Sequence, residues 1–577
     1  MSGTVRFDRF PTFDELVADL EGLAAAHSDV CTLSSVGTSY EGRDLWLATL
    51  TDATTGPAIE KPALWVDGNI HATELSGSVA ALHLVWRLCT GWADGDAEVR
   101  RLLTHRAVYV LPRVNPDGAE AAITNPQYLR SSVRPYPRVD QQDGLVPTDL
   151  DGDGRILTMR IKDGNGAWIA DDIDPRLLVV RDPTDDEEAD AGGVDRLGRQ
   201  RYRLLTEGAI QGYDGSTVGG APPLRGLDLN RNFSVAWKPE NEQQGAGPFA
   251  GSEPEIRALM QAIVDRPNIH SYIAYHTYSG VHLRPPSMAN DDSIPAGDLE
   301  TFKIIGKNLT RLTGYPSIST FHDFSYGPGD ITTGVADEWA YDHRGMWAWT
   351  TELWSPIADA GIEFNNAKPL EWFKDHPIED DRKLLEWNDT KLGGRGYVDW
   401  YAFDHPQLGY VELGGWWSAH CWRNPPPDRL PEVVAPHSEA AIWHALISPL
   451  LRQRSLTVER LSETTWKVRL EVENAGWLPT NVTEQAMKRN VVRPLEIRLL
   501  SGTEDGVVLH NAKPVRPLGQ LSGRNGKRPA GFFGGGENTS DRTYADFVIS
   551  APVGTEVRLE AWHERAGMVR ATVVLEG

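Results

Sequence analysis

The sequence predicts an α/β domain that is followed by a smaller all-β domain. Over most of the first 454 residues, short apolar runs typical of buried strands alternate with helical stretches, which indicates a sheet with at least some parallel pairing. After about residue 455, apolar and polar residues alternate with a period of two, and Gly- and Asn-rich turns separate the runs. This pattern is typical of a β-sandwich. We therefore expect two units, 1–454 and 455–577.

Each expected element of the first unit rests on a local pattern. Thr12 and Glu15 form a capping-box pattern in front of Leu16 and Leu20, which are spaced as on one face of a helix. Further along the chain, apolar runs predict buried strands and the stretches between them predict helices. The strands are expected over 63–68, 107–112, 269–275 and 346–351, and further helices over 76–90 and 253–264.

Two irregular stretches interrupt this pattern, over about 119–225 and 355–435. We interpret them as insertions, the first of which lies over one face of the sheet. The first contains Asp149, Asp151 and Asp153 in a pattern that resembles the start of a calcium-binding loop, although the glutamate expected at the twelfth loop position is missing. Two interpretations are open: a calcium ion that stabilises the insertion, or a solvated Asp–Gly turn without an ion.

Composition excludes several classes of function. The net charge is −24 at pH 7, from 57 Lys and Arg against 81 Asp and Glu, so general binding to the phosphate backbone of nucleic acid is not expected. No run of 18 apolar residues occurs, so no membrane span is expected. The first residues lack the apolar core of a signal peptide, and Cys31, Cys89 and Cys421 are too few for a disulfide framework. Both observations favour the cytoplasm, with secretion as the alternative if a leader has been removed.

Four ionisable residues lie at the ends of three expected strands. His71 and Glu74 follow the strand over 63–68, and His276 and Glu352 each end a later strand. In an open α/β sheet the functional crevice lies beyond the carboxyl ends of the strands. Two imidazoles, one carboxylate and a position left for water are the ligands of a catalytic zinc site. Any one of these residues alone is better explained as a hydrogen-bonded polar residue at a strand end, but the four together favour a zinc site.

Six short motifs occur in an order that resembles the zinc carboxypeptidases of the pancreatic carboxypeptidase A/B type. They are His71-Ala-Thr-Glu74, Asn115-Pro-Asp-Gly118, Asp228-Leu-Asn-Arg-Asn-Phe233, Ser252-Glu-Pro-Glu255, His276-Thr-Tyr-Ser279 and Thr351-Glu352-Leu353. The resemblance extends over roughly residues 10–355, apart from the first insertion. It implies a mixed, mostly parallel eight-stranded sheet flanked by helices, and a metallocarboxypeptidase that hydrolyses C-terminal peptide bonds.

The resemblance also implies the catalytic roles. His71, Glu74 and His276 would ligate one Zn²⁺, which polarises the scissile carbonyl and lowers the pKa of a bound water. Glu352 matches the general base that takes the proton of this water and passes it to the leaving amine. Glu412 also lies at the end of a strand-like segment and is the rival candidate, but Glu352 is preferred because it follows His276 by 76 residues in a sheet-like context.

Substrate-binding roles follow from the same resemblance. Asn230 and Arg231 match the pair that binds the C-terminal carboxylate of a peptide, a task for which the planar arginine side chain is suited. Arg130 lies where the family keeps the arginine that stabilises the oxyanion, and Arg134 competes for this assignment. Tyr278 is expected at the rim of the substrate site. The expected partners are therefore peptides with a free C-terminal carboxylate, and no nucleic acid or membrane.

The segment before Asp337 departs from the family. Residues 326–329 and 337–341 resemble the segments around the family's mobile tyrosine, but the connection between them is shorter and holds no tyrosine. Asp337 itself aligns with the base of the specificity pocket, where members of the carboxypeptidase B type carry an acid. A buried carboxylate favours a cationic partner, which predicts a preference for C-terminal Lys or Arg. The alternative is that Asp337 points outward or pairs with Arg344.

Other activities of the same site stay open. A zinc amidase or deacylase acting on peptidoglycan-like or acyl-amino-acid substrates would use the same residues, and an inactive module would bind peptides without chemistry. Retention of all four ionisable residues at the strand ends argues against the inactive module. Both insertions are expected to pack near the crevice rim and to restrict substrates to short peptides. The all-β domain is expected to have a role in structure or assembly, with carbohydrate binding as the alternative.

Overall fold

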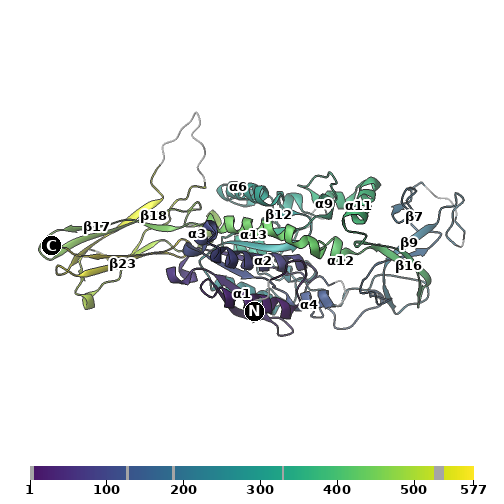
Figure 1. The fold of residues 1–577 in the computed structure, drawn as a ribbon, viewed down its shortest axis with the longest axis horizontal. Helices are drawn as coiled ribbons and strands as arrows, with labels where there is room; N and C mark the ends of the chain where they lie inside the picture. Colours follow the sequence, from purple (N-terminus) through teal and green to yellow (C-terminus); the bar gives the residue numbers. More distant parts are fainter. Residues whose placement is uncertain are drawn as a thin grey trace, which may run out of the picture.

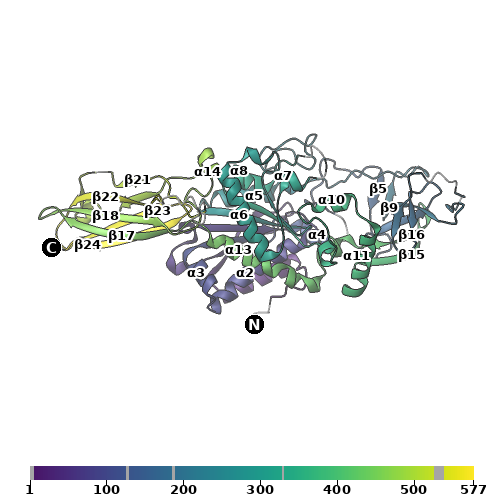
Figure 2. The same cartoon turned by 90° about the horizontal axis from the view of Figure 1, so that it is seen from above.

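The molecule is elongated and consists of three parts in a row (Figure 1, Figure 2). The α/β unit is in the middle, the C-terminal β domain is at one end, and a lobe built from the two insertions is at the other. The computed structural model describes residues 5–124, 129–184, 189–190, 192–325, 327, 331–511, 513–525 and 538–576.

An eight-stranded mixed sheet forms the centre of the α/β unit. Its strands, in spatial order, are β1 (Cys31–Thr38), β2 (Asp44–Leu50), β4 (Ala107–Leu111), β3 (Ala63–Gly68), β11 (Ile269–Thr277), β14 (Trp347–Leu353), β12 (Val281–Arg284) and β13 (Ser317–Ser319). The strand β3 pairs in parallel with β4 and β11, and β11 pairs in parallel with β14. The carboxyl ends of these central strands therefore meet at one edge of the sheet. The sheet confirms the expected fold class, and all four strands expected from apolar runs are present.

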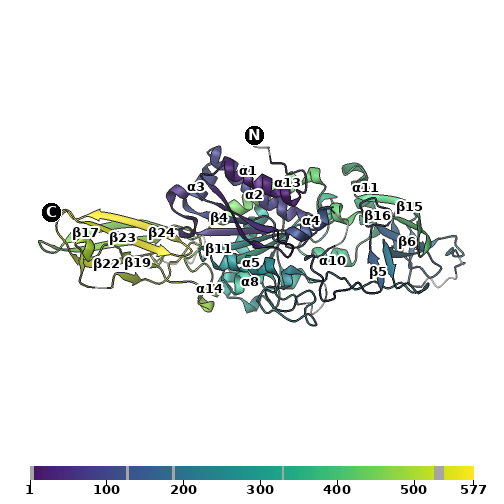
Figure 3. The same cartoon turned by 90° about the horizontal axis from the view of Figure 1, so that it is seen from below.

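Helices cover both faces of this sheet (Figure 3). One layer contains α1 (Phe13–Ala26), α2 (Leu75–Ala93), α3 (Ala97–His105) and α13 (Leu430–Leu446), and the other contains α5 (Pro254–Val264), α6 (Ala296–Thr313) and α8 (Ala336–Asp342). Because successive side chains of a strand point to opposite faces, Trp65 of β3 enters one core while Leu64 and Val66 enter the other. The predicted capping box is present, since Thr12 and Glu15 bond reciprocally at the start of α1.

The two insertions form a single lobe. Its main sheet has the order β15 (Tyr397–His405), β16 (Gly409–Trp416), β6 (Thr158–Lys162), β9 (Arg201–Thr206), β7 (Trp168–Ala170) and β8 (Leu178–Val180), and β5 (Gly144–Pro147) pairs with β10 (Gly208–Gln211). The second insertion adds α10 (Pro369–Lys374) and α11 (Ile378–Lys391), and short helices elsewhere are α4 (Pro116–Thr124), α7 (Thr320–Asp323), α9 (Pro356–Asp359) and α12 (Ser418–Cys421). The lobe extends the molecule beyond the central sheet (Figure 1). The expectation that the first insertion lies over one face of the sheet is therefore wrong, because β6 pairs with β16 of the second insertion instead.

The C-terminal domain is a sandwich of two four-stranded sheets. One contains β17 (Leu451–Arg460), β18 (Thr465–Asn474), β22 (Arg542–Ser550) and β20 (Val508–Leu509), and the other β21 (Val515–Pro517), β19 (Glu496–Leu499), β23 (Glu556–His563) and β24 (Gly567–Val574). The alternating residues Trp466, Val468 and Leu470 of β18 are buried between the sheets. The expected all-β domain is therefore confirmed, and its first strand begins a few residues before the expected boundary at 455.

The C-terminal domain packs directly against the turn between α8 and β14. The buried guanidinium of Arg565 donates hydrogen bonds to the carbonyl oxygens of Arg344 and Gly345, and Thr483 Oγ1 donates to the same Gly345 oxygen at 2.9 Å. Gly345 has a φ of +61°, and an added Cβ would lie 2.4 Å from Cβ of Ala486 in α14 (Glu484–Arg489). Only glycine allows so close an approach at this φ.

Two expectations about the class of protein can be compared with the structure. Within the described ranges, no helix combines the length and the apolar character that crossing a bilayer requires. Cys31, Cys89 and Cys421 are buried free thiols, which agrees with the absence of a disulfide framework expected from their number.

Candidate active site

The four ionisable residues at the strand ends converge. His276 and Glu352 occupy the same register on the neighbouring parallel strands β11 and β14. His71 and Glu74 lie in the turn between β3 and α2, at the same edge of the sheet. Asn69 stabilises this turn, because its Nδ2 donates to the carbonyl oxygens of His71 at 2.7 Å and Glu74 at 3.3 Å.

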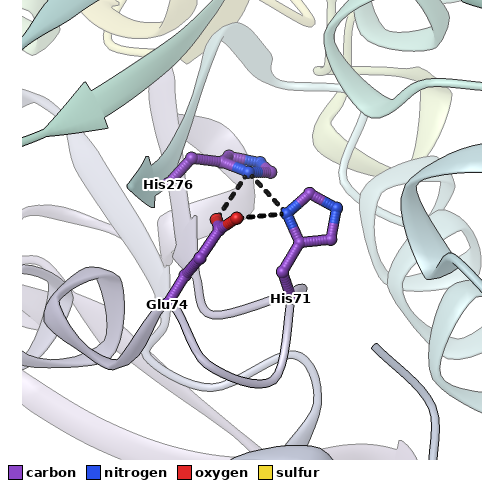
Figure 4. A group of neighbouring side chains, drawn as sticks. All are labelled: His71, Glu74 and His276. Atoms are coloured by element: carbon purple, nitrogen blue, oxygen red, sulfur yellow. Dashed lines mark hydrogen bonds and ion pairs between the residues drawn. The ribbon is translucent and has the colours of Figure 1, made fainter. Parts of the chain in front are cut away.

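His71, Glu74 and His276 point toward one another (Figure 4), and we refer to them as the zinc triad. His71 Nδ1 lies 2.8 Å from Glu74 Oε1 and 3.1 Å from His276 Nδ1, which in turn lies 3.0 Å from Glu74 Oε2. In a tetrahedral zinc site with ligand distances of about 2.0–2.2 Å, neighbouring ligand atoms are about 3.3–3.6 Å apart. Two imidazole nitrogens this close need a proton or a cation between them. The donor set and its spacing therefore fit zinc.

Asp228 and Arg130 support the zinc triad from one side. Asp228 Oδ1 is hydrogen bonded to His71 Nε2 at 3.1 Å, so Nδ1 is the nitrogen that faces the other triad atoms. Arg130 donates from Nε to Asp228 Oδ2 at 3.0 Å and from Nη1 to Glu74 Oε1 at 3.2 Å. Asp228 belongs to a motif found in the sequence, but the sequence assigned it no role, since only the folded chain shows that it contacts His71.

The pKa values of two buried carboxyl groups in the site, Glu74 and Glu352, are shifted in opposite directions. Burial alone would raise the pKa of Glu74, but the neighbouring His71 and His276 outweigh it and hold that pKa well below its usual value. Burial raises the pKa of Glu352 well above its usual value, and the negative charge of Glu74 adds to the rise. Acid and base roles are commonly found where the pKa values of neighbouring groups are pushed apart in this way.

Glu352 and Glu412, the two candidate bases, lie in different parts of the structure. Glu352 lines the cavity beside the zinc triad, and its buried Oε2 has no hydrogen-bond partner among the described residues. Glu412, in contrast, lies on β16 in the insertion lobe, where Arg160 Nε donates to its Oε2 at 2.7 Å. The rival candidate therefore lies outside the group of residues that line the cavity.

The cavity beside the zinc triad has a volume of about 440 Å³ and is lined by both members of the expected carboxylate-binding pair. Asn230 Oδ1 accepts a hydrogen bond from the Ala336 amide at 2.8 Å, which orients the side-chain amide. Arg231 Nη1 donates to the backbone carbonyl of Asn230 at 2.6 Å, which orients the guanidinium next to Asn230. A carboxylate in this cavity would meet an amide and a guanidinium.

Asp337 lies in the same cavity. It is 6 % exposed and lines the wall, so it does not point outward. Burial raises the pKa of its carboxyl group, while a hydrogen bond from Thr350 and the charge of Arg231 oppose the rise. Arg231 is thus a cation that acts on Asp337, and no ion pair joins Asp337 to Arg344 in the described part of the chain.

Known proteins resemble this chain over the same region. The sequence pattern of the zinc carboxypeptidase family matches residues 16–151 and 193–359, more than half of the chain. The chain belongs to the zinc carboxypeptidase family. Membership implies a catalytic zinc ion and supports metallocarboxypeptidase activity in general. Residues 450–574 match a domain of unknown function.

Individual relatives in the zinc carboxypeptidase family are distant. A zinc carboxypeptidase of Saccharothrix mutabilis subsp. capreolus is 34 % identical over 113 residues, which cover 19 % of this chain and 25 % of the relative. Human carboxypeptidase A6 is 21 % identical over 363 residues, 60 % of each chain. Carboxypeptidase B of Astacus astacus is 23 % identical over 59 % of this chain and 85 % of its own. The chain thus spans less than two thirds of the first two relatives. The solved carboxypeptidase A of Helicoverpa armigera aligns over 68 % of this chain and 75 % of its own, with a TM-score of 0.40 and 17 % identity.

The structure separates the two arginines that compete for the oxyanion role of the family. Arg130 lines the cavity beside the zinc triad. Arg134 is absent from the lining residues, and its guanidinium donates to both carboxylate oxygens of buried Glu253, at 2.9 and 2.6 Å. This two-point pairing fixes Arg134 away from the cavity, so its predicted contact with substrate is not supported and Arg130 is the remaining candidate.

The second insertion supplies part of the cavity wall, which sequence reasoning missed. Tyr278 lines the cavity as expected, and Phe373 of α10 packs edge-on against it with ring centroids 5.6 Å apart. Arg423 Cζ lies 6.0 Å from the centre of the same ring and also lines the cavity. No local pattern marks Phe373 or Arg423, because their place depends on how an insertion packs against distant strand ends.

The segment that carries the mobile tyrosine in the family is short in this chain. Residues 326 and 328–330, which include most of the expected flanking motif, lie outside the described residues. In the described stretch 331–336, Thr332 and Val335 line the cavity, and no tyrosine occurs. Lys374 of the second insertion, which also lines the cavity, donates to the carbonyl oxygen of Ser325 in the preceding segment at 3.3 Å.

Asp149, Asp151 and Asp153 converge in the insertion lobe, with ligand oxygens within 4.8 Å of one another. Asp149 accepts hydrogen bonds from the amides of Gly152 and Gly154, at 2.7 and 3.0 Å. Asp151 and Asp153 each accept from the amide two residues further on. A solvated Asp–Gly turn has the same bonds, so the calcium site stays a prediction.

Proposed function

We propose that the chain is a zinc-dependent metallocarboxypeptidase that hydrolyses the C-terminal peptide bond of peptides. The observation that carries this proposal is the shared cavity, which the zinc triad, Glu352 and the Asn230–Arg231 pair all line. A substrate carboxylate bound by Asn230 and Arg231 would leave the terminal peptide bond close to the zinc triad and to Glu352. An exopeptidase requires this combination, because it must recognise a chain end as well as cleave a bond.

The proposed mechanism assigns one task to each group. His71, Glu74 and His276 would hold a zinc ion, which would supply polarisation of the scissile carbonyl, a lower pKa of the attacking water and a positive charge that favours the ionised form of Glu352. Glu352 Oε2, which has no hydrogen-bond partner among the described residues, accepts the proton of this water and passes it to the nitrogen of the leaving amine. Arg130, at the edge of the triad, stabilises the negative charge that develops on the carbonyl oxygen.

Asp337 is proposed to favour C-terminal Lys or Arg. Its buried carboxyl group lines the same cavity as Asn230 and Arg231. When this pair binds the terminal carboxylate of a peptide, the side chain of the last residue would lie within reach of Asp337. A basic side chain would compensate a negative charge that is costly to bury alone. Pairing with a basic side chain requires the ionised form of Asp337. Burial opposes ionisation because it raises the pKa of Asp337, and a cationic substrate favours it.

A C-terminally varied peptide library tests the activity and the metal together. The zinc-loaded protein should release C-terminal amino acids, should stop doing so after chelation, and should recover when zinc is added back. Release that chelation leaves unchanged would overturn the zinc mechanism. Release from muropeptides or N-acyl amino acids, but not from ordinary peptides, would identify the amidase or deacylase instead.

Two further expectations belong to this proposal. A calcium ion in the insertion lobe is supported by the convergence of Asp149, Asp151 and Asp153. A reducing compartment is supported by the three buried free thiols. Neither is needed for the proposed reaction.

A further inference from the structure

A second hollow lies in the insertion lobe, and we refer to it as the lobe groove. Strands β6–β9, β15 and β16 line one side of it, and residues 373–381 of the α10–α11 region line the other. Its volume is about 630 Å³, compared with about 440 Å³ for the cavity beside the zinc triad. The lobe groove is thus a hollow of substrate size that the proposed reaction does not use.

Ion pairs hold the two sides of the lobe groove at a fixed separation. Arg382 of α11 donates to both carboxylate oxygens of Asp171, the residue after β7, at 3.0 and 2.5 Å. Arg176, shortly before β8, donates to both oxygens of Asp389 in α11, at 3.2 and 2.8 Å. Pairs with two parallel hydrogen bonds fix direction as well as distance. The lobe groove is therefore preformed.

Aromatic rings with satisfied polar atoms line the lobe groove. The Tyr397 hydroxyl and Trp400 Nε1 both donate to the Arg176 carbonyl, at 2.5 and 2.8 Å. Trp416 packs edge-on against Tyr397 with centroids 5.2 Å apart, and Trp168 of β7 also lines the groove. Because the Tyr397 and Trp400 polar atoms are bonded within the protein, a ligand meets mainly their apolar ring surfaces. Such surfaces bind side chains of varied type.

The lobe groove continues from the catalytic cavity. Phe373 and Lys374, at the end of α10, line both hollows. On the cavity side Phe373 packs against Tyr278. Behind it, His376 stacks on Trp372 with centroids 3.8 Å apart and bonds to the Trp372 carbonyl at 2.9 Å, which stiffens this part of the chain. The two hollows are therefore adjacent and share a ridge formed by Phe373 and Lys374.

We propose that the lobe groove binds the part of a peptide substrate that lies N-terminal to the scissile bond. The inference rests on the proposed function, in which Asn230 and Arg231 bind the C-terminal carboxylate inside the cavity. The rest of a longer peptide has to leave the cavity, and the ridge of Phe373 and Lys374 connects it to the lobe groove. We assign peptide as the occupant because the adjoining catalytic cavity holds the C-terminal end of a peptide in the proposed function. The insertions then favour long peptides, in contrast to the expectation from the sequence.

A series of substrates of increasing length tests this inference. Blocked peptides of about two to ten uncharged residues share the same C-terminal dipeptide and are compared by kcat/KM. The wild type is expected to hydrolyse the longest roughly ten-fold more efficiently than the shortest, the effect of one or two well-packed aromatic contacts. A kcat/KM that does not depend on length would overturn the inference and leave the proposed function standing.

Three variants locate the length dependence. Trp168→Ala removes an aromatic wall, and Val180→Asp changes a groove residue that is 64 % exposed, so it disturbs little packing. Tyr410→Ala is the matched control, since Tyr410 is 56 % exposed in the same lobe but does not line the groove. Both groove variants should lose most of the roughly ten-fold advantage of the long peptide and keep the rate on the dipeptide, whereas the control keeps both. Groove variants that slow both substrates equally would overturn the inference.

Binding without turnover separates this inference from the proposed reaction. A fluorescent ten-residue peptide should bind to the Glu352→Gln variant roughly ten-fold more tightly than a labelled dipeptide, and adding Trp168→Ala should remove the difference. This result would support the lobe groove even if no peptide were hydrolysed. Equal affinities for the two peptides would overturn it. Displacement of the labelled peptide by a chitin-type oligosaccharide would identify a glycan site and overturn the assignment to peptide.

Discussion

Replacing Asp337 by Asn would remove a negative charge from the catalytic cavity and keep the size of the side chain. A substrate cation about 4 Å from a carboxylate interacts with it by about 4 kcal/mol at an effective dielectric constant of about 20. Arg231 already acts on Asp337, and the substrate cation must leave water, so only part of this energy remains. We expect a net loss of about 2–3 kcal/mol, near the lower end of the range for breaking a buried charge pair. At about 1.36 kcal/mol per factor of ten, this corresponds to roughly 30- to 150-fold in kcat/KM.

The assay compares kcat/KM for two matched peptides that end in Arg and in Phe. The Arg/Phe ratio should fall roughly 30- to 150-fold in Asp337→Asn, with little change in the rate on the Phe peptide. Glu338→Gln is the control, because Glu338 is the next residue of α8 and accepts the Ser287 amide at 2.7 Å without lining the cavity. It should leave the ratio unchanged. A wild type that prefers Phe, or a ratio that Asp337→Asn does not alter, would refute the reasoning and leave the zinc mechanism intact.

Four further predictions concern catalysis, metal binding and stability. Glu352→Gln should keep its zinc in metal analysis but lower kcat by about 10²- to 10⁴-fold, because an amide cannot accept the water proton; a near-wild-type kcat would show that another group is the base. His276→Ala should lose zinc and activity together. Asp228→Asn should weaken zinc binding about 10- to 100-fold in competition with a chelating dye, because it removes the anion that orients the His71 imidazole. Wild-type zinc affinity in either variant would contradict the role of the residue that was replaced. Burial lowers the pKa of His83 to about 4 from its usual value of 6.5, so the unfolded chain takes up the proton first. The stability that His83 contributes is therefore complete above pH 6.5 and is lost as the pH falls toward 4, and His83→Gln should flatten the fall of Tm across this window; an identical pH profile would contradict it. Adding Ca²⁺ to the zinc-loaded protein should raise Tm through the loop at Asp149, and an unchanged Tm would exclude that site.

The zinc triad and Glu352 could be placed from the sequence because each lies at the end of a locally recognisable strand. The apolar runs that become β3, β11 and β14 are continuous, as expected for strands buried on both faces. Once three such strands pair in parallel, their ends meet, and the register of His276 with Glu352 follows. The position of these residues therefore depends on short-range pattern and on a general rule of sheet topology.

The substrate side of the site could be predicted only in part. Arg130 and Arg134 are four residues apart in one loop, and nothing local shows that Glu253 binds the second. Phe373 and Arg423 enter the cavity wall from the second insertion, whose fold depends on β16 pairing with β6 far earlier in the chain. Strand alternation indicates that a segment forms a strand, but it does not identify a partner about 250 residues away.

The contact of Arg565 with the turn between α8 and β14 has a consequence for the evolution of this chain. The carbonyl groups that Arg565 and Thr483 bind belong to the turn that joins the helix of Asp337 to the strand of Glu352. A gene shortened near codon 450 would encode a chain in which the Gly345 carbonyl has lost these donors and the turn has lost its contact with Ala486. Recombination at this border would therefore alter the contacts of the turn before β14, the strand that carries the proposed base. We expect the α/β unit and the C-terminal domain to be inherited together.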